Sequence, residues 1–451
     1  MTASPDPAAS FAAHLDTVLQ RALPMLEGCG HDSLVIHSGT HRIAFRDDQA
    51  LPLRSEPFFL WAVPLRDTPD CLLQLTPGRK PVLVFQSADD FWHKPAQLPD
   101  AAWTRCFDIR PVTSAEAARR ALDPITDRSA FIGEPFDGLA ALGIAHVNPQ
   151  PLLRRLDEQR VRKTPWEADC LRAASLLGAR GHLSAADAFH RGGSEFDIHQ
   201  AFLAGCQLRE QELPYQAIVA LNDNAATLHY QQLQRRAPAQ RHALLIDAGA
   251  QRHGYASDIT RTYAAAEGPF AALVQGMNAL QQALCAAVRP GIDWRDLHLT
   301  AHQLLAELLV EQGLIQLDPE RAVREGLTGA FLPHGLGHLL GLQVHDVGGR
   351  LPHPDGPTLE PPAGHPFLRL TRVLEPGFVV TMEPGLYFID SLLERTRQGQ
   401  HAGAINWRRV QALRACGGIR IEDNLLVTDS GCENLTRDAF DRLATGVPAA
   451  S

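Results

Sequence analysis

The sequence predicts two domains, an α/β domain over residues 1–160 and a larger α+β domain over residues 161–451. Its 451 residues are about three times the length of a usual domain, which favours more than one core. Helical and strand patterns alternate in the first part, and a charged stretch, EQRVRKTP at 158–165, separates it from a long helical pattern. The composition, 45% apolar and 21% charged, is that of a globular protein and excludes collagen-like and disordered classes.

The first domain is predicted from short elements of both kinds. Apolar residues recur at helical spacing over residues 8–26, and EAARRAL at 116–122 has the same spacing. LVIHSG at 34–39 and PVLVFQS at 81–87 are continuous apolar runs of the length of buried strands. This alternation is typical of an α/β or α+β domain.

The second domain begins with a helix, because Pro165 and Glu167 open the pattern WEADCLRAASLL with a proline and an acid in its first turn. Ser194 and Asp197 form a capping box for another helix. Further strands are expected at 217–221, 243–249, 254–263, 379–388 and 418–428, and further helices at 269–288 and 294–312. The segment LPHPDGPTLEPPAGHPF is too rich in proline for a regular element and is predicted to be a long loop, 351–367.

Charge and cysteine patterns exclude several classes of protein. Lys and Arg number 42 against 51 Asp and Glu, a net charge of −9, which does not favour a nucleic-acid partner. No apolar run reaches the ~18 residues of a membrane span, and no basic residue precedes the first apolar stretch, as one would in a secretory signal. The eight cysteines form no CxxC pair, so reduced and mostly buried thiols are expected in a cytoplasmic protein.

Two aspartates flank one predicted turn. In ALLIDAGAQRHGYASDITRTY a symmetric hairpin would place Asp247 and Asp258 opposite each other on one face. Like charges at that spacing destabilise a sheet unless a cation lies between them, and a pair of divalent ions fits there. The alternative is that one of the two aspartates faces solvent.

A second cluster lies in PHGLGHLLGLQVHD, which contains His334, His338 and His345. Neutral imidazole is the commonest metal ligand and also serves as a general acid or base. The interleaved glycines allow close approach of the backbone to a ligand. The alternative is a structural role for these histidines.

Two glutamates, Glu383 and Glu422, each follow an apolar, strand-like run. A buried carboxylate is costly unless it is paired or bound to a metal, whereas at a strand end it could face water. Taken together, the candidates supply four carboxylates and one imidazole, a hard donor set suited to Mn²⁺ or a similar ion. The proposed metal ligands are Asp247, Asp258, His338, Glu383 and Glu422.

The motifs IDAGA and YASDITRTY, HGLGHLLGLQVHD, TMEPGLYF and GIRIEDN occur in the order found in a known family. They resemble the bacterial-type prolidases (Xaa-Pro dipeptidases, peptidase family M24B), which belong with aminopeptidase P and methionine aminopeptidase to the pita-bread metallopeptidases. HSGTHRIAFRDDQALP and LPYQAIVALNDNAATLHY extend the resemblance over nearly the whole chain. It implies a pita-bread (creatinase/aminopeptidase) catalytic domain over residues 161–451.

The resemblance also implies how the metals are held. Asp258, His338, Glu383 and Glu422 would bind one ion and Asp247 with Asp258 the other, with Asp258 and Glu422 bridging the two. Members of this family typically use manganese. A hydroxide held between the ions would attack the carbonyl of an Xaa-Pro dipeptide.

Other roles follow from the same resemblance. Glu383 would carry a proton to the leaving prolyl nitrogen. His345 would stabilise the tetrahedral intermediate by hydrogen bonding, and Arg420 would steady the site.

Recognition of the substrate is also implied by the resemblance. Arg369 would bind the dipeptide's terminal carboxylate, with Arg372 as the competing candidate. The small pocket would be lined by His229 and Tyr215. Asp48 would reach the site of the partner subunit in a homodimer to meet the α-amino group, with the adjacent Asp47 as the alternative.

Three alternatives to an Xaa-Pro dipeptidase stay open. An aminopeptidase P-like enzyme would accept longer peptides, and an organophosphorus acid anhydrolase would hydrolyse phosphotriesters as its main or side activity. A non-catalytic binding module would have lost metal ligands, and here none is missing. The loop 351–367 is expected to border the pocket, since it lies between His345 and Arg369 in the chain.

Overall fold

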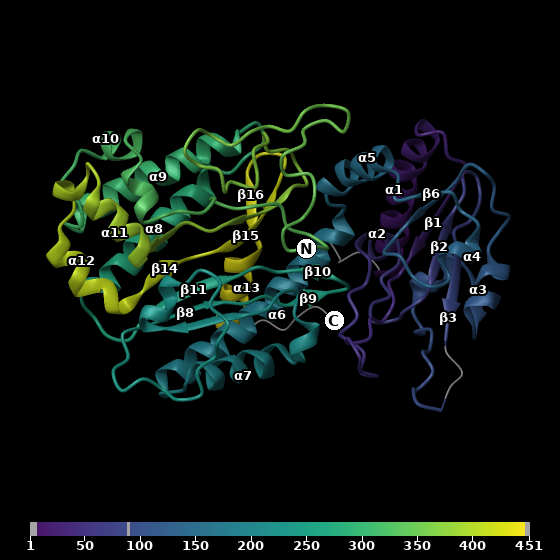
Figure 1. The fold of residues 1–451 in the computed structure, drawn as a ribbon, viewed down its shortest axis with the longest axis horizontal. Coiled ribbons are helices and arrows are strands. Elements are labelled where there is room, and N and C mark those ends of the chain that lie inside the picture. The colour runs from purple at the N-terminus through teal and green to yellow at the C-terminus, as the bar shows by residue number, and fades with distance from the viewer. Residues whose placement is uncertain (1–6, 88–90, 447–451) are drawn as a thin grey trace. The chain divides into compact units, whose positions relative to one another are not determined.

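The computed structural model describes residues 7–87 and 91–446, and these form two compact units (Figure 1). The first unit contains the described residues up to Glu167 together with His353–Pro357. The second contains Ala168–Pro352 and the described residues from Thr358 onward.

The first unit is built on a six-stranded sheet with the order β4-β3-β2-β1-β5-β6. The antiparallel neighbours are β1 with β2 and β2 with β3, and the remaining neighbours are parallel. Its strands are β1 (Ser33–His37), β2 (Leu72–Leu75), β3 (Val82–Gln86), β4 (Asp108–Val112), β5 (Ser129–Ile132) and β6 (His146–Val147). Its helices are α1 (Pro7–Gly28), α2 (Pro57–Ala62), η1 (Ala102–Cys106), α3 (Ala115–Ala121), α4 (Leu139–Leu142) and α5 (Gln150–Val161).

The core of this sheet contains Val35, Val84 and Phe131, with Ala118 of α3 and Leu142 of α4 packed against them. The two predicted strands correspond to β1 and β3, and the two predicted helices to α1 and α3, so these predictions are confirmed. An α/β N-terminal domain is therefore confirmed as well.

The second unit carries several short sheets, of which the largest have the orders β11-β8-β7 and β12-β15-β16. The ribbons β13-β14 and β10-β9 complete them, and β14 contacts both β8 and β11. The strands are β7 (Ile218–Leu221), β8 (Ala243–Asp247), β9 (Gln251–Arg252), β10 (Tyr255–Ala256), β11 (Thr260–Ala264), β12 (Val379–Met382), β13 (Gly385–Tyr387), β14 (Gly418–Arg420), β15 (Asp423–Val427) and β16 (Cys432–Asn434).

Helices cover the strands of this unit on two sides: α6 and α7 lie on one side and α8 and α9 on the other (Figure 1). The longer helices are α6 (Pro165–His190), α7 (Glu195–Cys206), α8 (Pro269–Ala287), α9 (Trp294–Glu311), α11 (Asp390–Gln398) and α13 (Leu435–Ala444). Shorter turns of helix are η2 (Glu210–Glu212), η3 (Asn222–Ala226), α10 (Pro319–Arg324), η4 (Leu327–Ala330), η5 (Ala402–Ala404), α12 (Trp407–Leu413) and η6 (Arg414–Cys416). The predicted capping box of Ser194 and Asp197 is confirmed at the start of α7.

The register of the hairpin between β8 and β11 corrects one prediction. Asp247 pairs with Thr260 and not with Asp258. The reason is the turn, because His253 and Gly254 both have positive φ, 52° and 88°, as the two central residues of a type I′ turn require. This moves the turn one residue along the chain from the symmetric hairpin expected between the two aspartates.

The proline-rich segment 351–367 contains no helix or strand, as predicted. Within the described residues, no helix is long and apolar enough to cross a bilayer.

His182 of α6 lies in the core of the second unit, and its burial can be tested through its titration. Its side chain is fully buried, its Nε2 donates to the carbonyl oxygen of Ala248 (2.9 Å), and its ring packs edge-on against Phe202. Burial lowers its pKa to about 3.

We predict that His182→Gln flattens the dependence of stability on pH. An unfolded chain protonates this histidine near its ordinary pKa of about 6.5, whereas the folded chain does not, so wild-type stability falls as the pH falls. Between pH 7.5 and 5.5 the wild type should lose about 1.4 kcal/mol more than the variant, measured by urea unfolding. His190→Gln, at an exposed position of the same helix, is the control and should behave as wild type. Parallel curves for wild type and His182→Gln would contradict the prediction.

Candidate metal centre and substrate cavity

A cavity of about 720 Å³ lies in the second unit, and nine of the predicted site residues line it. They are His229, Asp247, Asp258, His338, His345, Arg369, Glu383, Arg420 and Glu422. Segments from 229 to 422 thus converge on one site.

The acidic residues occupy strand ends. Asp247 is the last residue of β8, Glu383 follows β12, and Glu422 lies between β14 and β15. Glu422 is held by its backbone N–H, which donates to the carbonyl oxygen of Thr260 (3.0 Å). The carboxylates therefore meet where several strands terminate together.

His338 is positioned by the backbone around it. Its N–H donates to Thr381 Oγ1 (3.0 Å), and its carbonyl oxygen accepts from the N–H of Thr381 (2.9 Å). This approach requires Gly337, because a Cβ there would overlap the carbonyl oxygen of Thr381. Nδ1 of His338 bonds the carbonyl oxygen of Leu339 (3.0 Å), so Nε2 is left to face the carboxylates.

The donor atoms are close together. One donor atom each from Asp258, His338 and Glu422 lies within 4.8 Å of the others. His338 Nε2 is 3.4 Å from Asp258 Oδ2 and 3.5 Å from Glu383 Oε1. This is a set of hard oxygen donors with one imidazole, which fits divalent cations such as Mn²⁺.

The pKa values show that it is unfavourable for all the carboxylates of this cluster to be ionised without a bound cation. Burial raises the pKa of Glu383 to about 7 and the pKa of Glu422 well above its usual range. The pKa of Asp247 is also raised by burial, against the opposing charge of Arg420. For Asp258, burial acts in the same direction, but hydrogen bonding and charge from His338 outweigh it and lower the pKa. Bound cations would remove this conflict, so the residues present fit a metal pair.

Arg420 holds the cluster from one side. Its buried guanidinium donates from Nη2 to Asp247 Oδ2 (2.6 Å), from Nη1 to Tyr387 Oη (2.8 Å) and from Nε to Thr260 Oγ1 (3.2 Å). Thr260 Oγ1 donates in turn to Glu422 Oε2 (2.6 Å). These bonds orient two of the carboxylates, the position expected of a residue that steadies the site.

His345 lies beside His338, one of the proposed metal ligands. Its ring is perpendicular to that of His338, with centroids 4.4 Å apart. Burial, with the charges of His338 and Arg369, lowers the pKa of His345 to about 4, so this ring is neutral at pH 7.

The two candidate arginines are separated by the structure. Arg369 lines the cavity, and none of the described carboxylates pairs with it. Arg372 is buried elsewhere, where it donates to the carbonyl oxygens of Gly348 and Leu351 and stacks over Phe378. Arg369 is therefore the arginine available to a ligand.

Two predicted substrate residues are placed differently from the rest. Tyr215 is not in the cavity wall, and its hydroxyl donates to Asp247 Oδ1 (2.7 Å), so it orients a proposed metal ligand. Asp48 belongs to the first unit, in an exposed segment where its N–H donates to Asp47 Oδ1 (2.7 Å). Neither Asp47 nor Asp48 lines the cavity of the second unit.

Part of the cavity wall was not assigned from the sequence. His334 lines it and bonds Tyr387 Oη through Nε2 (2.8 Å), although the sequence only grouped it with the neighbouring histidines. The apolar wall contains Leu228, Pro366 and Phe367, for which the sequence carries no chemical signal. Pro366 and Phe367 also confirm that the end of the loop 351–367 borders the cavity.

These features define the class of protein: the chain belongs to metallopeptidase family M24. The profile of that family matches residues 169–429, and the profile of the N-terminal domain of Xaa-Pro dipeptidases matches residues 9–157. The family uses a dinuclear centre of divalent metal ions, so the chain is an enzyme that acts as a metallopeptidase.

Among named relatives, the chain is similar to Xaa-Pro dipeptidases. It is 46% identical over 436 residues to that of Stenotrophomonas maltophilia, covering 96% of this chain and 98% of the relative. It is also 46% identical over 432 residues to that of Aeromonas hydrophila, covering 95% and 98%.

Solved structures of aminopeptidase P share the fold. The aminopeptidase PepP of Pseudomonas aeruginosa has a TM-score of 0.71 and 23% identity, over 96% of this chain and 98% of that one. Aminopeptidase P of E. coli with the inhibitor Pro-Leu has a TM-score of 0.71 and 22% identity, over 94% and 95%. The expected pita-bread fold of the catalytic domain is confirmed.

We predict that removal of divalent metal destabilises the second unit. A chelator should lower the melting temperature and Mn²⁺ should restore it, because an ion present at a hundred times its Kd stabilises the folded chain by about 2.7 kcal/mol. Asp258→Asn removes a proposed metal ligand and should respond much less to either treatment. A melting temperature of the wild type that is the same with chelator and with Mn²⁺ would contradict the proposed ligand set.

Proposed function

We propose that this chain hydrolyses Xaa-Pro dipeptides, with proline at the C-terminal position, by means of two divalent ions, Mn²⁺ by preference. The observation that carries the proposal is that five proposed metal ligands and an arginine without a carboxylate partner face one cavity. The relatives at 46% identity, which span nearly the whole chain, are named Xaa-Pro dipeptidases and support it.

The metals would be held by the carboxylate cluster. When bound, they would supply a Lewis acid for the scissile carbonyl and a nucleophile at neutral pH. The proposed ligands are Asp247, Asp258, His338, Glu383 and Glu422.

Glu383 is suited to move a proton. The nitrogen of an Xaa-Pro bond has no hydrogen and must gain one when the bond breaks. Glu383 lies in the cavity wall, and a carboxylate there can take up a proton and then give it up to the nitrogen of the breaking bond. We assign it the transfer of a proton to the prolyl nitrogen.

His345 is suited to stabilise developing negative charge. With its pKa lowered to about 4, it is a neutral ring that can donate one N–H hydrogen bond toward the carbonyl oxygen of the substrate. Arg420 would act through Asp247 and Glu422 as a positioning residue.

Arg369 would recognise the substrate's free carboxylate. A guanidinium binds a carboxylate through two parallel hydrogen bonds, and in a dipeptide that carboxylate belongs to the proline itself. This limits the length of the substrate. His229, also in the cavity wall, would contact the same end of the dipeptide. The two enzymatic alternatives, an aminopeptidase P-like activity and organophosphate hydrolysis as the main activity, are not favoured.

We also propose a cytoplasmic homodimer. Ile43, Phe45 and Leu51, around Asp48, have exposed fractions of 55%, 93% and 48%. Exposed apolar groups that cluster in this way are typical of interaction surfaces, and a second copy would bring Asp48 toward the α-amino group of a substrate in the other subunit. The eight free cysteines support a reducing compartment.

We predict that Arg369→Met raises KM for Leu-Pro by about 100-fold or more, since a lost charge-assisted pair costs about 3 kcal/mol. Leu-Pro amide lacks the carboxylate, so it should be a poor substrate of the wild type and an equally poor substrate of the variant. Arg350→Met, in the same cavity wall, is the control and should change KM far less. Rapid cleavage of Leu-Pro-Gly by the wild type would instead support the aminopeptidase alternative, and no cleavage of Leu-Pro with Mn²⁺ would refute the proposal.

We predict that Phe45→Glu converts the dimer to monomers, because the charge would be buried in the contact. Light scattering after size exclusion measures this directly. Phe91→Glu changes another exposed phenylalanine of the first unit and should leave the dimer intact. A monomeric wild type would refute the dimer.

A further inference from the structure

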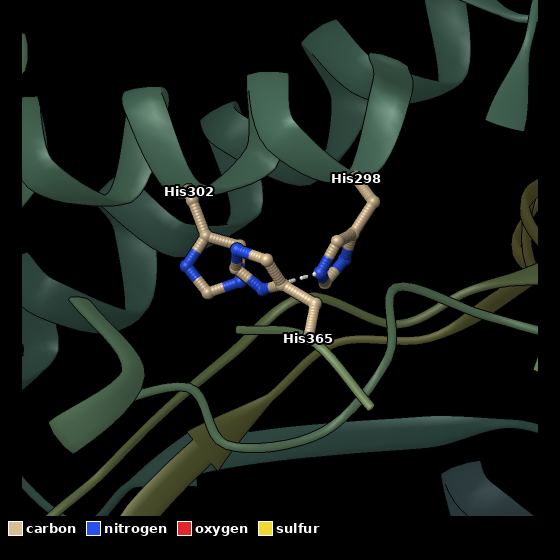
Figure 2. Close-up of side chains that lie close together, drawn as sticks. All are labelled: His298, His302 and His365. Atoms are coloured by element: carbon tan, nitrogen blue, oxygen red, sulfur yellow. Dashed lines mark hydrogen bonds between the residues drawn. The ribbon is translucent and has the colours of Figure 1, made fainter. Parts of the chain in front are cut away.

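Three histidines outside the cavity form a second cluster, in which the rings lie close together in edge-to-face arrangements (Figure 2). His298 and His302 lie on α9 four residues apart, so they share a face of the helix. His365 comes from the end of the loop 351–367. One ligand nitrogen from each ring lies within 4.8 Å of the other two.

We propose that His298, His302 and His365 form a binding site for one transition-metal ion, Zn²⁺ by preference. The site shares no residue with the carboxylate-rich centre and differs from it in chemistry. An all-imidazole donor set suits zinc and similar ions, whereas carboxylate oxygens suit harder ions such as Mn²⁺.

The nitrogen atoms are arranged for such an ion. His302 Nδ1 bonds Thr328 Oγ1 (2.9 Å), which leaves Nε2 for a ligand, and this Nε2 is buried with no hydrogen-bond partner in the described structure. Orientation of one ring nitrogen by a neighbouring polar group is the usual arrangement of a metal-binding histidine. Figure 2 shows the rings of His302 and His298 on either side of His365.

One pair of ring nitrogens is already close to the spacing that a zinc ion requires. His298 Nε2 and His365 Nδ1 are joined by a hydrogen bond of 2.9 Å. Two nitrogens on a tetrahedral zinc ion are about 3.3 Å apart, because each Zn–N bond is about 2.0 Å long. The ring that carries the bonding hydrogen would place it on its other nitrogen, so both lone pairs would face the ion and no proton would leave the protein.

The environment favours uncharged rings with free lone pairs. Burial lowers the pKa of His298 to about 2 and that of His302 to about 3, so an ion would not compete with protons at neutral pH. Both side chains are 1% exposed, whereas His365 is only half-buried, which gives an ion and a completing water ligand access from its side.

Occupation of this site would also affect the substrate cavity, a consequence that rests on the proposed function. His365 is followed directly by Pro366 and Phe367 of the cavity wall and then by Arg369. An ion bound to His365 would fix this segment to α9. The affinity for the substrate carboxylate would therefore depend on zinc, while the carboxylate centre kept its own metal.

The test counts zinc in the full-length protein. After removal of metals and dialysis against Zn²⁺ with excess Mn²⁺, wild type should retain one more zinc ion per chain than His302→Gln. His182→Gln replaces another buried histidine outside the cluster and should match wild type. His365→Gln, at a half-buried loop position, should also lack the ion, and it keeps the test valid if His302→Gln does not fold.

X-ray absorption should show that the additional zinc has nitrogen ligands. Equal zinc content in wild type and both cluster variants, or zinc with oxygen ligands only, would overturn the proposal. These readouts do not depend on peptidase activity, so they separate failure of the zinc site from failure of the proposed function. A KM for Leu-Pro that does not change with zinc while the ion is bound would overturn the link to the cavity.

Discussion

The architecture of the second unit depends on bringing four carboxylates together away from water. Asp258 and Glu422 are buried, and Asp247 and Glu383 are largely so, which would be unfavourable without positive charge beside them. Arg420 supplies one such charge through a short bond to Asp247. Divalent ions would supply the remaining positive charge, so metal binding would stabilise the fold of this unit.

Several strands of the second unit end at the cavity and so bring the acidic side chains together. Since β8, β12 and β14 each terminate at the cavity, side chains that are far apart in the chain meet there. The backbones of these strands remain hydrogen-bonded to neighbouring strands. Gly337 allows the strand end at Thr381 to approach His338. The rigid scaffold thereby fixes the ligands, while the segment ending at Arg369 forms a cavity wall without regular structure.

Much of this could be predicted from the sequence, and the failures have physical reasons. Acids that follow apolar strand runs, such as Glu383 and Glu422, are recognisable because a buried unpaired charge is costly. The register of Asp247 was predicted wrongly, because it depends on positive φ at His253 and Gly254, which the residue pattern around them did not settle. The choice of Arg369 over Arg372 needed the fold, since only the structure shows which guanidinium is already bonded.

The histidine cluster shows the same limit, because His365 lies 67 residues from His298 in the chain and only tertiary structure brings the two together. Anomalous diffraction at the manganese edge, from crystals grown with Mn²⁺, tests whether the buried carboxylates hold a pair of divalent ions. We expect two peaks, both among Asp247, Asp258, His338, Glu383 and Glu422. A map with no peak among these residues would contradict this expectation.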